Sequence, residues 1–276
     1  MRGLRSPCTP CRSSTVAGCL AGGDGFPVLH AFRTVTSGAP DELTLWAQFL
    51  QFPPITEVPE PLRGGSFIAV DVAYLGSADD VAPLLALFRE IPGIVLDTLD
   101  TLGTLGTMPI SLLGTIAAEP VDPTPTAEIS WLMGDLDDNA IEALIALVGH
   151  GSGSPLAVVQ LRHLGGAFRR ASEDDGPTGA VNEPYLLFGL AVLTAPETLV
   201  DAEITFGELT SALEGRFTGR SLFNFLMADS DPTRAFSATA LTRLQQIKRT
   251  VDPDQVLVSN RPVVAARTAH PMAQPS

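Results

Sequence analysis

The hydrophobic and polar positions of the chain follow two periods, and the shorter one predicts strands. In residues 41–52, apolar side chains at the odd positions from Leu43 to Phe49 alternate with mostly polar ones at the even positions. This is the two-residue period of a strand with one buried face. Residues 184–193 are continuously apolar, which indicates a strand buried on both faces. The other predicted strands are residues 66–74, 94–96, 128–133 and 156–164.

A second set of segments repeats its apolar residues every three or four positions, which predicts amphipathic helices. These segments are residues 27–37, 78–89, 137–148, 196–213 and 241–251. The last helix must end before Pro253, because proline cannot continue the hydrogen-bond ladder of a helix. The apolar residues 256–258 are then expected to lead the chain back onto the core.

These elements alternate irregularly, which favours the α+β class. We predict one largely antiparallel sheet with helices packed on one face, and a C-terminal helix and tail docked back onto the core. No G-x-G-x-x-G pattern follows a predicted strand, so no Rossmann-type nucleotide site is expected. Residues 97–125 contain several glycines and prolines and are predicted to be mostly loop.

Composition and charge narrow the classes of partner. The 276 residues carry a net charge of −14, which argues against a nucleic-acid partner. No run of about 18 apolar residues is present, so no membrane span is predicted. Residues 1–25 and 265–276 show no periodicity and are expected to be disordered.

The cysteines give no metal site. Cys8, Cys11 and Cys19 all lie near the start of the chain, and the Cys8-x-x-Cys11 pair lacks the second ligand pair of a zinc site. The rest of the chain has no cysteine, which fits a reducing or an indifferent compartment. We therefore expect a cytoplasmic protein without a metal.

The C-terminal helix carries a more specific pattern. Its matching residues are Arg243-Leu244, Ile247-Lys248, Val251-Asp252-Pro253, Leu257 and Asn260. This pattern resembles the C-terminal signature of FAD-linked oxidases of the berberine bridge enzyme type, which include 6-hydroxy-nicotine oxidase. Val251 stands where Tyr is usual in that family, and Leu257 stands where Phe is usual.

Two further segments resemble the same family. Residues 161–168 (LRHLGGAF) resemble a strand and Gly-Gly corner of its substrate domain, and residues 223–225 (FNF) resemble a motif whose Asn lies near the flavin. The resemblance implies that Asn224 and Asn260 contact the flavin. The alternative is that their side chains only cap backbone groups. The substrate-pocket candidates are Gln160, Arg162, His163 and Tyr185. Gln160 and Arg162 should face one side of their strand and His163 the other, and both Arg162 and His163 could equally be sheet-surface residues.

The resemblance implies a function, and it also implies that one domain of the family has no counterpart here. Residues 26–264 correspond to the substrate domain of such an oxidase, with residues 221–264 as its berberine-bridge-like C-terminal segment. The cofactor implied is FAD, and the partners are a small organic substrate and either a separate flavin-binding half or further copies of the chain. The main FAD-binding domain of the family has no counterpart in this sequence, which suggests a truncated oxidoreductase that is inactive alone. The alternative is a non-catalytic α+β binding or oligomerisation module.

The catalytic residue stays unassigned at this stage. Family members often carry a polar or acidic base on the strand that corresponds to residues 185–193. In this chain that strand is apolar, and only Tyr185 offers a hydroxyl group. No general base can therefore be named from the sequence.

Overall fold

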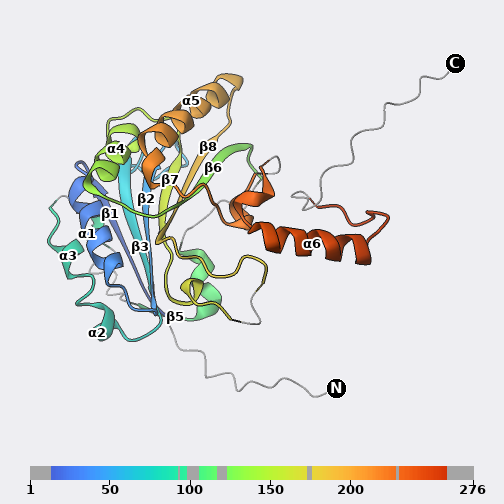
Figure 1. Cartoon of the computed structure of the whole chain (residues 1–276). Helices are drawn as coiled ribbons and strands as arrows, with labels where there is room; N and C mark the ends of the chain where they lie inside the picture. The colour runs from blue at the N-terminus through green and yellow to red at the C-terminus, as the bar shows by residue number, and fades with distance from the viewer. Residues whose placement is uncertain are drawn as a thin grey trace.

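One antiparallel sheet forms the centre of the molecule (Figure 1). The computed structural model describes residues 14–92, 94–97, 106–116, 123–172, 176–227 and 230–259. Its strands are β1 (Ser14–Gly22), β2 (Leu43–Gln51), β3 (Ser66–Tyr74), β4 (Ile94–Asp97), β5 (Gly106–Met108), β6 (Thr126–Met133), β7 (Val158–His163) and β8 (Tyr185–Val192). Their order is β4-β1-β3-β2-β7-β8-β6, with β5 paired to β1, and every pair is antiparallel.

Three helices cover one face of this sheet, and Figure 1 shows α1, α4 and α5 side by side over it. They are α1 (Phe26–Ser37), α4 (Asp138–Val148) and α5 (Pro196–Ala212). Phe32, Leu144 and Leu209 from these helices are fully buried in a single core with the alternate strand residues Leu45, Leu161 and Leu187. The predicted α+β class, the antiparallel sheet and the one-sided helical layer are confirmed.

The N-terminal segment differs from the prediction. Residues 1–25 were expected to be disordered, but Ser14–Gly22 forms β1, which pairs with β3 over eight residues from Thr15↔Tyr74 to Gly22↔Phe67. The segment is rich in Gly and Ala, so its alternation is weak in the sequence, and pairing with β3 on one side and β4 on the other supplies its backbone hydrogen bonds. The prediction is wrong for this strand, and residues 1–13 lie outside the described residues.

The segment predicted as one helix at residues 78–89 forms two short helices instead. They are α2 (Ala78–Val81) and α3 (Ala86–Arg89). Pro83 lies between them, and proline has no N–H to donate within a helix. Val81, Leu85 and Phe88 still reach the main core, so the apolar spacing identified the buried side chains correctly.

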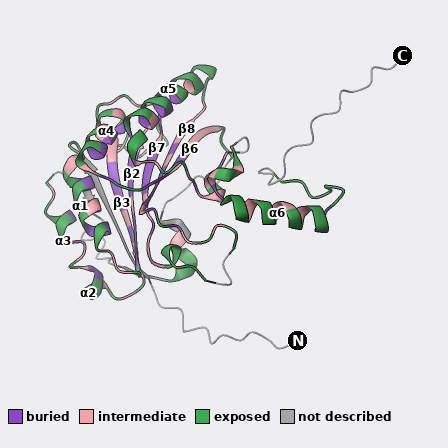
Figure 2. Cartoon of the chain, viewed as in Figure 1, coloured by how far each residue is buried: buried purple, intermediate pink, exposed green. Residues whose placement is uncertain are grey.

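The C-terminal helix α6 (Ala238–Val251) has the predicted stripe but only part of the predicted docking. Leu241 and Leu244 pack against a small cluster formed by Leu226, Ala235 and Phe236. Further along, Ile247 and Val251 are 48% and 70% exposed. Figure 1 shows the helix projecting away from the sheet, and Figure 2 shows no buried residue along it.

The tail after α6 is also exposed, which corrects the prediction that it leads back onto the core. Val256, Leu257 and Val258 are 69–93% exposed. Asp252 holds this tail in a fixed turn: its Oδ1 accepts the Val256 N–H at 2.8 Å and its Oδ2 accepts the Leu257 N–H at 3.1 Å. The side chain of Lys248 binds both Asp252 and, at 2.7 Å, the carbonyl oxygen of Leu257. The tail is therefore ordered by its own contacts rather than by the core.

None of the helices in the described part of the chain is long and apolar enough to span a membrane.

Candidate functional site

The sheet face opposite the helices carries polar and aromatic side chains. We call it the second face, and its residues on the central strands are Trp46 and Gln48 of β2, Asp71 of β3, Gln160 and Arg162 of β7, and Phe188 of β8. Side chains alternate along a strand, so these positions point away from the core positions Leu45, Ala47, Val70 and Leu161. The β2–β3 and β2–β7 registers place Trp46 opposite both Asp71 and Arg162.

Four of these side chains form one hydrogen-bonded line across three strands, which we call the polar row (Asp71, Gln48, Gln160 and Arg162). Gln48 Nε2 donates to Asp71 Oδ2, and Gln160 Nε2 donates to Gln48 Oε1 at 2.6 Å. Arg162 donates from Nε and Nη2 to Gln160 Oε1, at 2.8 and 2.6 Å. Each amide accepts on one side and donates on the other, so the row runs in one direction from a cation to a carboxylate.

Aromatic rings hold the guanidinium of Arg162 in place. Its central carbon lies 4.0 Å from the centroid of the Trp46 ring and 4.9 Å from that of Phe225. Phe225 belongs to the short helix η4 (Phe223–Phe225), which is tied to β6 because Ser130 Oγ donates to the Phe225 carbonyl oxygen at 2.7 Å. Stacking on aromatic faces and hydrogen bonding at the edge together fix the position of this cation.

A cavity of about 340 Å³ opens beside Arg162. Its apolar walls come from the strands and from the segments around the short helices η2 (Gly166–Arg169) and η4. The lining includes Trp46, Arg162, His163, Leu222 and Phe225. An apolar cleft with a few fixed polar groups is the usual form of a small-molecule site.

Asp71 is the unusual titratable group on the second face. Burial raises its pKa from 3.8 to about 6, and the hydrogen bond from Gln48 lowers it by a smaller amount. A carboxyl group with a raised pKa can exchange protons near neutral pH, which is the property of a general acid or base. The sequence analysis missed Asp71, although a single acid within the apolar strand residues 66–74 was a signal that could have found it.

The structure divides the four predicted pocket residues between two places. Gln160 and Arg162 lie together in the polar row, as the strand alternation predicted. Tyr185 lies on the helix side, where its hydroxyl group is 2.7 Å from Thr36 Oγ1 and its ring packs against Phe32. Burial raises the pKa of Tyr185.

His163 also lines the cavity, and its ring lies 6.2 Å from the Tyr185 ring. Burial lowers the pKa of His163, and the positive charge of Arg169 lowers it further. Both effects favour the neutral imidazole beside the cavity. Its Nδ1 is buried and has no hydrogen-bond partner in the part of the chain that the structure describes.

The Gly-Gly corner after β7 shapes one wall of the cavity. Gly166 has a φ of +52°, and a Cβ atom at this position would lie 2.9 Å from the backbone oxygen of Asp41. Only glycine adopts such a conformation at little cost. The corner thus brings residues 166–169 close against the start of β2.

Gly166→Ala is expected to lower the free energy of unfolding by about 1–2 kcal/mol, the cost of a left-handed conformation for a residue with a Cβ. Denaturant unfolding would measure this change. The control is Gly207→Ala within α5, where no atom lies within 4 Å of the new Cβ and a gain of roughly 0.5–1 kcal/mol is expected from helix propensity. Equal effects at the two positions would contradict the assignment of strain to the corner.

Of the two predicted flavin contacts, Asn224 lies within the described residues and Asn260 does not. Asn224 lies on η4 between Phe223 and Phe225, is exposed, and makes no side-chain hydrogen bond to any residue that the structure describes. Among the described residues it caps no backbone group. Asn260 lies outside the described residues.

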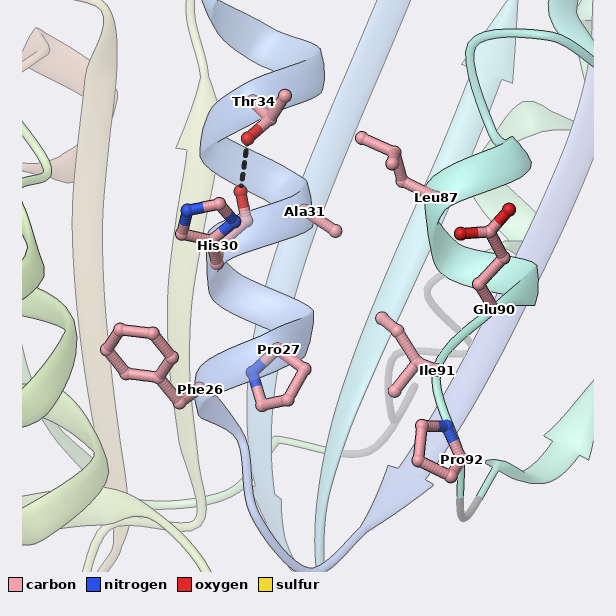
Figure 3. Close-up of a pocket in the computed structure, with 9 residues that line it drawn as sticks. All are labelled: Phe26, Pro27, His30, Ala31, Thr34, Leu87, Glu90, Ile91 and Pro92. Carbon is pink, nitrogen blue, oxygen red and sulfur yellow. Dashed lines mark hydrogen bonds between the residues drawn. The ribbon is translucent and has the colours of Figure 1, made fainter.

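A second depression lies on the opposite side of the molecule, between α1 and the segment around α3 (Figure 3). Its volume is about 490 Å³, and its walls are mostly apolar, with Pro27, Ala31, Leu87 and Ile91 facing the gap. No cluster of metal-ligating side chains occurs anywhere among the described residues. The chemistry-bearing side chains thus gather on the second face of the sheet and not in this depression.

Comparisons with known proteins identify the fold. No family model and no curated protein matches the sequence. Among solved structures, berberine bridge enzyme-like 1 from Physcomitrella patens is similar with a TM-score of 0.67 and 15% identity, over 92% of this chain and 55% of that chain. Berberine bridge enzyme from Eschscholzia californica has a TM-score of 0.64 and 11% identity, over 91% of this chain and 54% of that chain. 6-hydroxy-D-nicotine oxidase from Arthrobacter nicotinovorans has a TM-score of 0.61 and 15% identity, over 91% of this chain and 53% of that chain.

The likeness that the C-terminal signature predicted is therefore confirmed at the level of the fold, which is one that oxidases use. This chain spans about half the length of the solved structures that it matches.

Proposed function

We propose that this chain is the substrate-binding part of an FAD-dependent oxidoreductase that transfers a hydride from an organic substrate to flavin N5. The shared fold with berberine bridge enzyme-like structures supports this proposal, because it extends over 91–92% of the chain. The resemblance of residues 221–264 to the C-terminal signature of that family supports it independently. Fold alone does not specify chemistry, so the argument depends on the site.

The observation that carries the proposal is the polar row on the second face of the sheet. A sheet face that only closed a hydrophobic core would be apolar, whereas this one buries Gln48 and Gln160 to 7% and 6% exposure. Their amides are fully engaged between Asp71 and Arg162, beside a cavity with aromatic walls. A row of this kind fixes a cation and a carboxylate on the surface where a substrate can lie.

The described residues fit one wall of a flavin site. Phe225 offers an aromatic surface, and the neighbouring exposed amide of Asn224 offers the donor and acceptor that the polar edge of a planar ring system requires. When bound, the flavin supplies the hydride acceptor, and the protein supplies position and electrostatics. The sequence has no glycine-rich phosphate loop after a strand, so the phosphates of FAD have to be held by another polypeptide segment.

The exposed part of α6 and its tail is the surface on which that other segment is expected to dock. Ile247, Val251 and residues 256–258 expose apolar side chains next to one another in the chain. The hydrogen bonds of Asp252 and Lys248 already fix the tail, so a partner would meet an ordered surface and lose less entropy on binding. We propose a separate or adjoining flavin-binding half as this partner, and the cytoplasm as the compartment.

The test joins or mixes this chain with the flavin-binding half of a structurally similar oxidase and follows the visible spectrum. A yellow complex whose flavin is bleached by an organic substrate without oxygen supports the proposal. A preparation that stays colourless after incubation with FAD, and a complex whose flavin no substrate reduces, would refute it.

Asn224→Ala tests the flavin contact directly. Since the Asn224 side chain is exposed and makes no described hydrogen bond, its loss should change the free energy of unfolding by less than about 0.5 kcal/mol. In the complex, the same change should shift the flavin absorbance bands or weaken FAD binding. The matched control is Asn139→Ala on α4, an exposed asparagine on the helix side of the sheet. If both variants leave the flavin spectrum unaltered, Asn224 is not a contact.

A second candidate function is a non-catalytic α+β module that binds or oligomerises through the same apolar surface. The exposed stripe of α6 favours it, because large apolar patches drive association. Sedimentation of the chain without flavin distinguishes the two. Stable oligomers that exclude a flavin-binding half support the module, whereas association with that half at the expense of oligomers supports the oxidoreductase.

A further inference from the structure

We propose that the cavity beside Arg162 takes a small organic acid, with an apolar or aromatic ring and a single carboxylate, and that the guanidinium of Arg162 binds the carboxylate. Because the cavity is a substrate site only under the proposed function, this substrate class rests on that proposal. It concerns how the substrate is recognised and not how it is oxidised.

Arg162 brings a fixed positive charge to the wall of the cavity. The registers pair it with Trp46 of β2 and with Leu186 of β8, and all three residues line the cavity. The Trp46 ring stacks on the guanidinium, and Gln160 accepts hydrogen bonds from its Nε and Nη2. Rings and amides are neutral, so these contacts hold the cation in position without cancelling its charge.

The shape of the guanidinium allows Arg162 to bind an anion while it keeps its bonds to Gln160. An arginine carries five N–H donors in a planar fork. A carboxylate can accept from two donors of such a fork in one plane, and this pair is stronger than a hydrogen bond between neutral groups. Arg162 is also half-buried, so water screens the pair less than it would on an open surface.

The charges around the cavity favour an anion. Asp41 is the one acid among the described residues that line it, and Asp41 forms an ion pair with Arg170. Arg169 lies close enough for its positive charge to lower the pKa of His163, another lining residue. The whole chain has a net charge of −14, so this positive region departs from the charge of the molecule. Such a region attracts an anion and repels a cation.

The rest of the wall is apolar and suits a ring. Its side chains include Phe168, Leu186, Leu222 and Phe225. The volume of about 340 Å³ lies near the lower end of the range of small-molecule sites, which is roughly 300–1,000 Å³. The cavity therefore suits one ring with a short acidic side chain better than a long or highly polar molecule.

The number of cations favours a carboxylate over a phosphate. Among the described residues that line the cavity, Arg162 is the one with a permanent positive charge. A phosphate group carries a charge of about −1.5 to −2 at pH 7, so a single guanidinium would leave part of it uncompensated in an apolar site. A carboxylate carries one negative charge, which one guanidinium balances.

Three probes with the same ring test this substrate class on the chain without flavin: phenylacetate is an anion, phenylacetamide is neutral and 2-phenylethylamine is a cation. The readout is an NMR titration of the indole N–H signals of the two tryptophans. Trp46 lines the cavity, whereas Trp131 packs on Phe217 outside it. Phenylacetate should shift the Trp46 signal and not the Trp131 signal. The other two probes should bind at least about tenfold more weakly, because they lack the charge-assisted hydrogen bonds.

Two variants test the role of Arg162. Arg162→Met should weaken the binding of phenylacetate about 10–100-fold and change that of phenylacetamide by less than about threefold. Arg162→Lys keeps the charge but loses the planar fork, so its affinity for phenylacetate should lie between those of the wild type and Arg162→Met. The matched control is Arg89→Met, which makes the same chemical change at an exposed arginine of α3 and should leave both affinities unaltered.

The wild-type comparison decides the outcome even if a variant fails to fold. Equal affinities for phenylacetate and phenylacetamide, or no shift of the Trp46 signal by phenylacetate, would overturn the substrate class. The proposed function would stand in that case, because an oxidoreductase can also take a neutral substrate. A complex with a flavin-binding half that no substrate reduces would instead refute the proposed function, and it would leave the affinities measured on the chain unchanged.

Discussion

At pH 8, Asp71→Asn is expected to raise the free energy of unfolding by up to about 3 kcal/mol. The carboxylate of Asp71 is ionised at this pH but is half-buried without an ion-pair partner among the described residues. A rise of its pKa from 3.8 to about 6 corresponds to this free energy, at 1.36 kcal/mol for each pKa unit. Asparagine is neutral and similar in shape, so it removes the cost of burying the charge.

The pH dependence has a definite sign. The folded state binds the Asp71 proton more tightly than the unfolded state, so between about pH 3.8 and pH 6 the wild type loses stability as the pH rises. The advantage of the variant is therefore complete above about pH 6 and disappears toward pH 4. Urea unfolding at several pH values would measure it.

The control for this series is Asp254→Asn, which changes an exposed acid in the C-terminal turn and should alter stability by less than about 0.5 kcal/mol. An Asp71→Asn protein that is no more stable than the wild type at pH 8 would show that burial does not perturb this carboxyl group.

Phe32→Ala is expected to lower the free energy of unfolding by about 3–5 kcal/mol, the usual range for removing a buried phenylalanine ring. Phe32 is fully buried in the main core between α1 and the sheet. Its ring lies 5.8 Å from that of Tyr185, so the change also removes an aromatic contact across the layer. Denaturant unfolding of the purified chain would measure the loss.

Phe168→Ala serves as the comparison, because this ring is 52% exposed on η2. We expect a change of less than about 0.5 kcal/mol at this position. A similar loss in both variants would mean that the helix layer and the sheet do not form the cooperative core described above.

The sequence predicted most of the sheet because the central strands have a strong period. The alternation in β2 and the continuous apolar run of β8 were visible without knowing which strands pair. β1 was missed because its glycines and alanines carry little pattern, and only pairing with β3 and β4 on both sides defines it. The contact between α6 and the core was overestimated. An amphipathic stripe shows that one face of a helix has a partner, but it does not show how much of that face is covered by the same chain.

The site was predicted only in part, for a similar reason. Strand alternation placed Gln160 and Arg162 on one face, and the structure agrees. The roles of Gln48 and Asp71 depend on which strands lie side by side, and Gln48 is 112 residues from Gln160 in the sequence. No local sequence pattern predicts such a contact. The single acid of β3, Asp71, was the one signal in the sequence of this strand.

The order of the strands has a consequence for how the molecule assembles. Strands β1 to β4 form one side of the sheet and β6 to β8 form the other. Among the described residues, the strands of the two sides pair only between β2 and β7, from Trp46↔Arg162 to Leu50↔Val158. Each side is built from neighbouring stretches of sequence. Pairing β2 with β7 instead requires closure of a long loop, so we expect this pairing to be a slow step in folding. The hydrogen bond between Gln48 and Gln160 crosses this join. Neither half of the sheet can therefore assemble the polar row by itself, and the row is complete only in chains whose two halves have met.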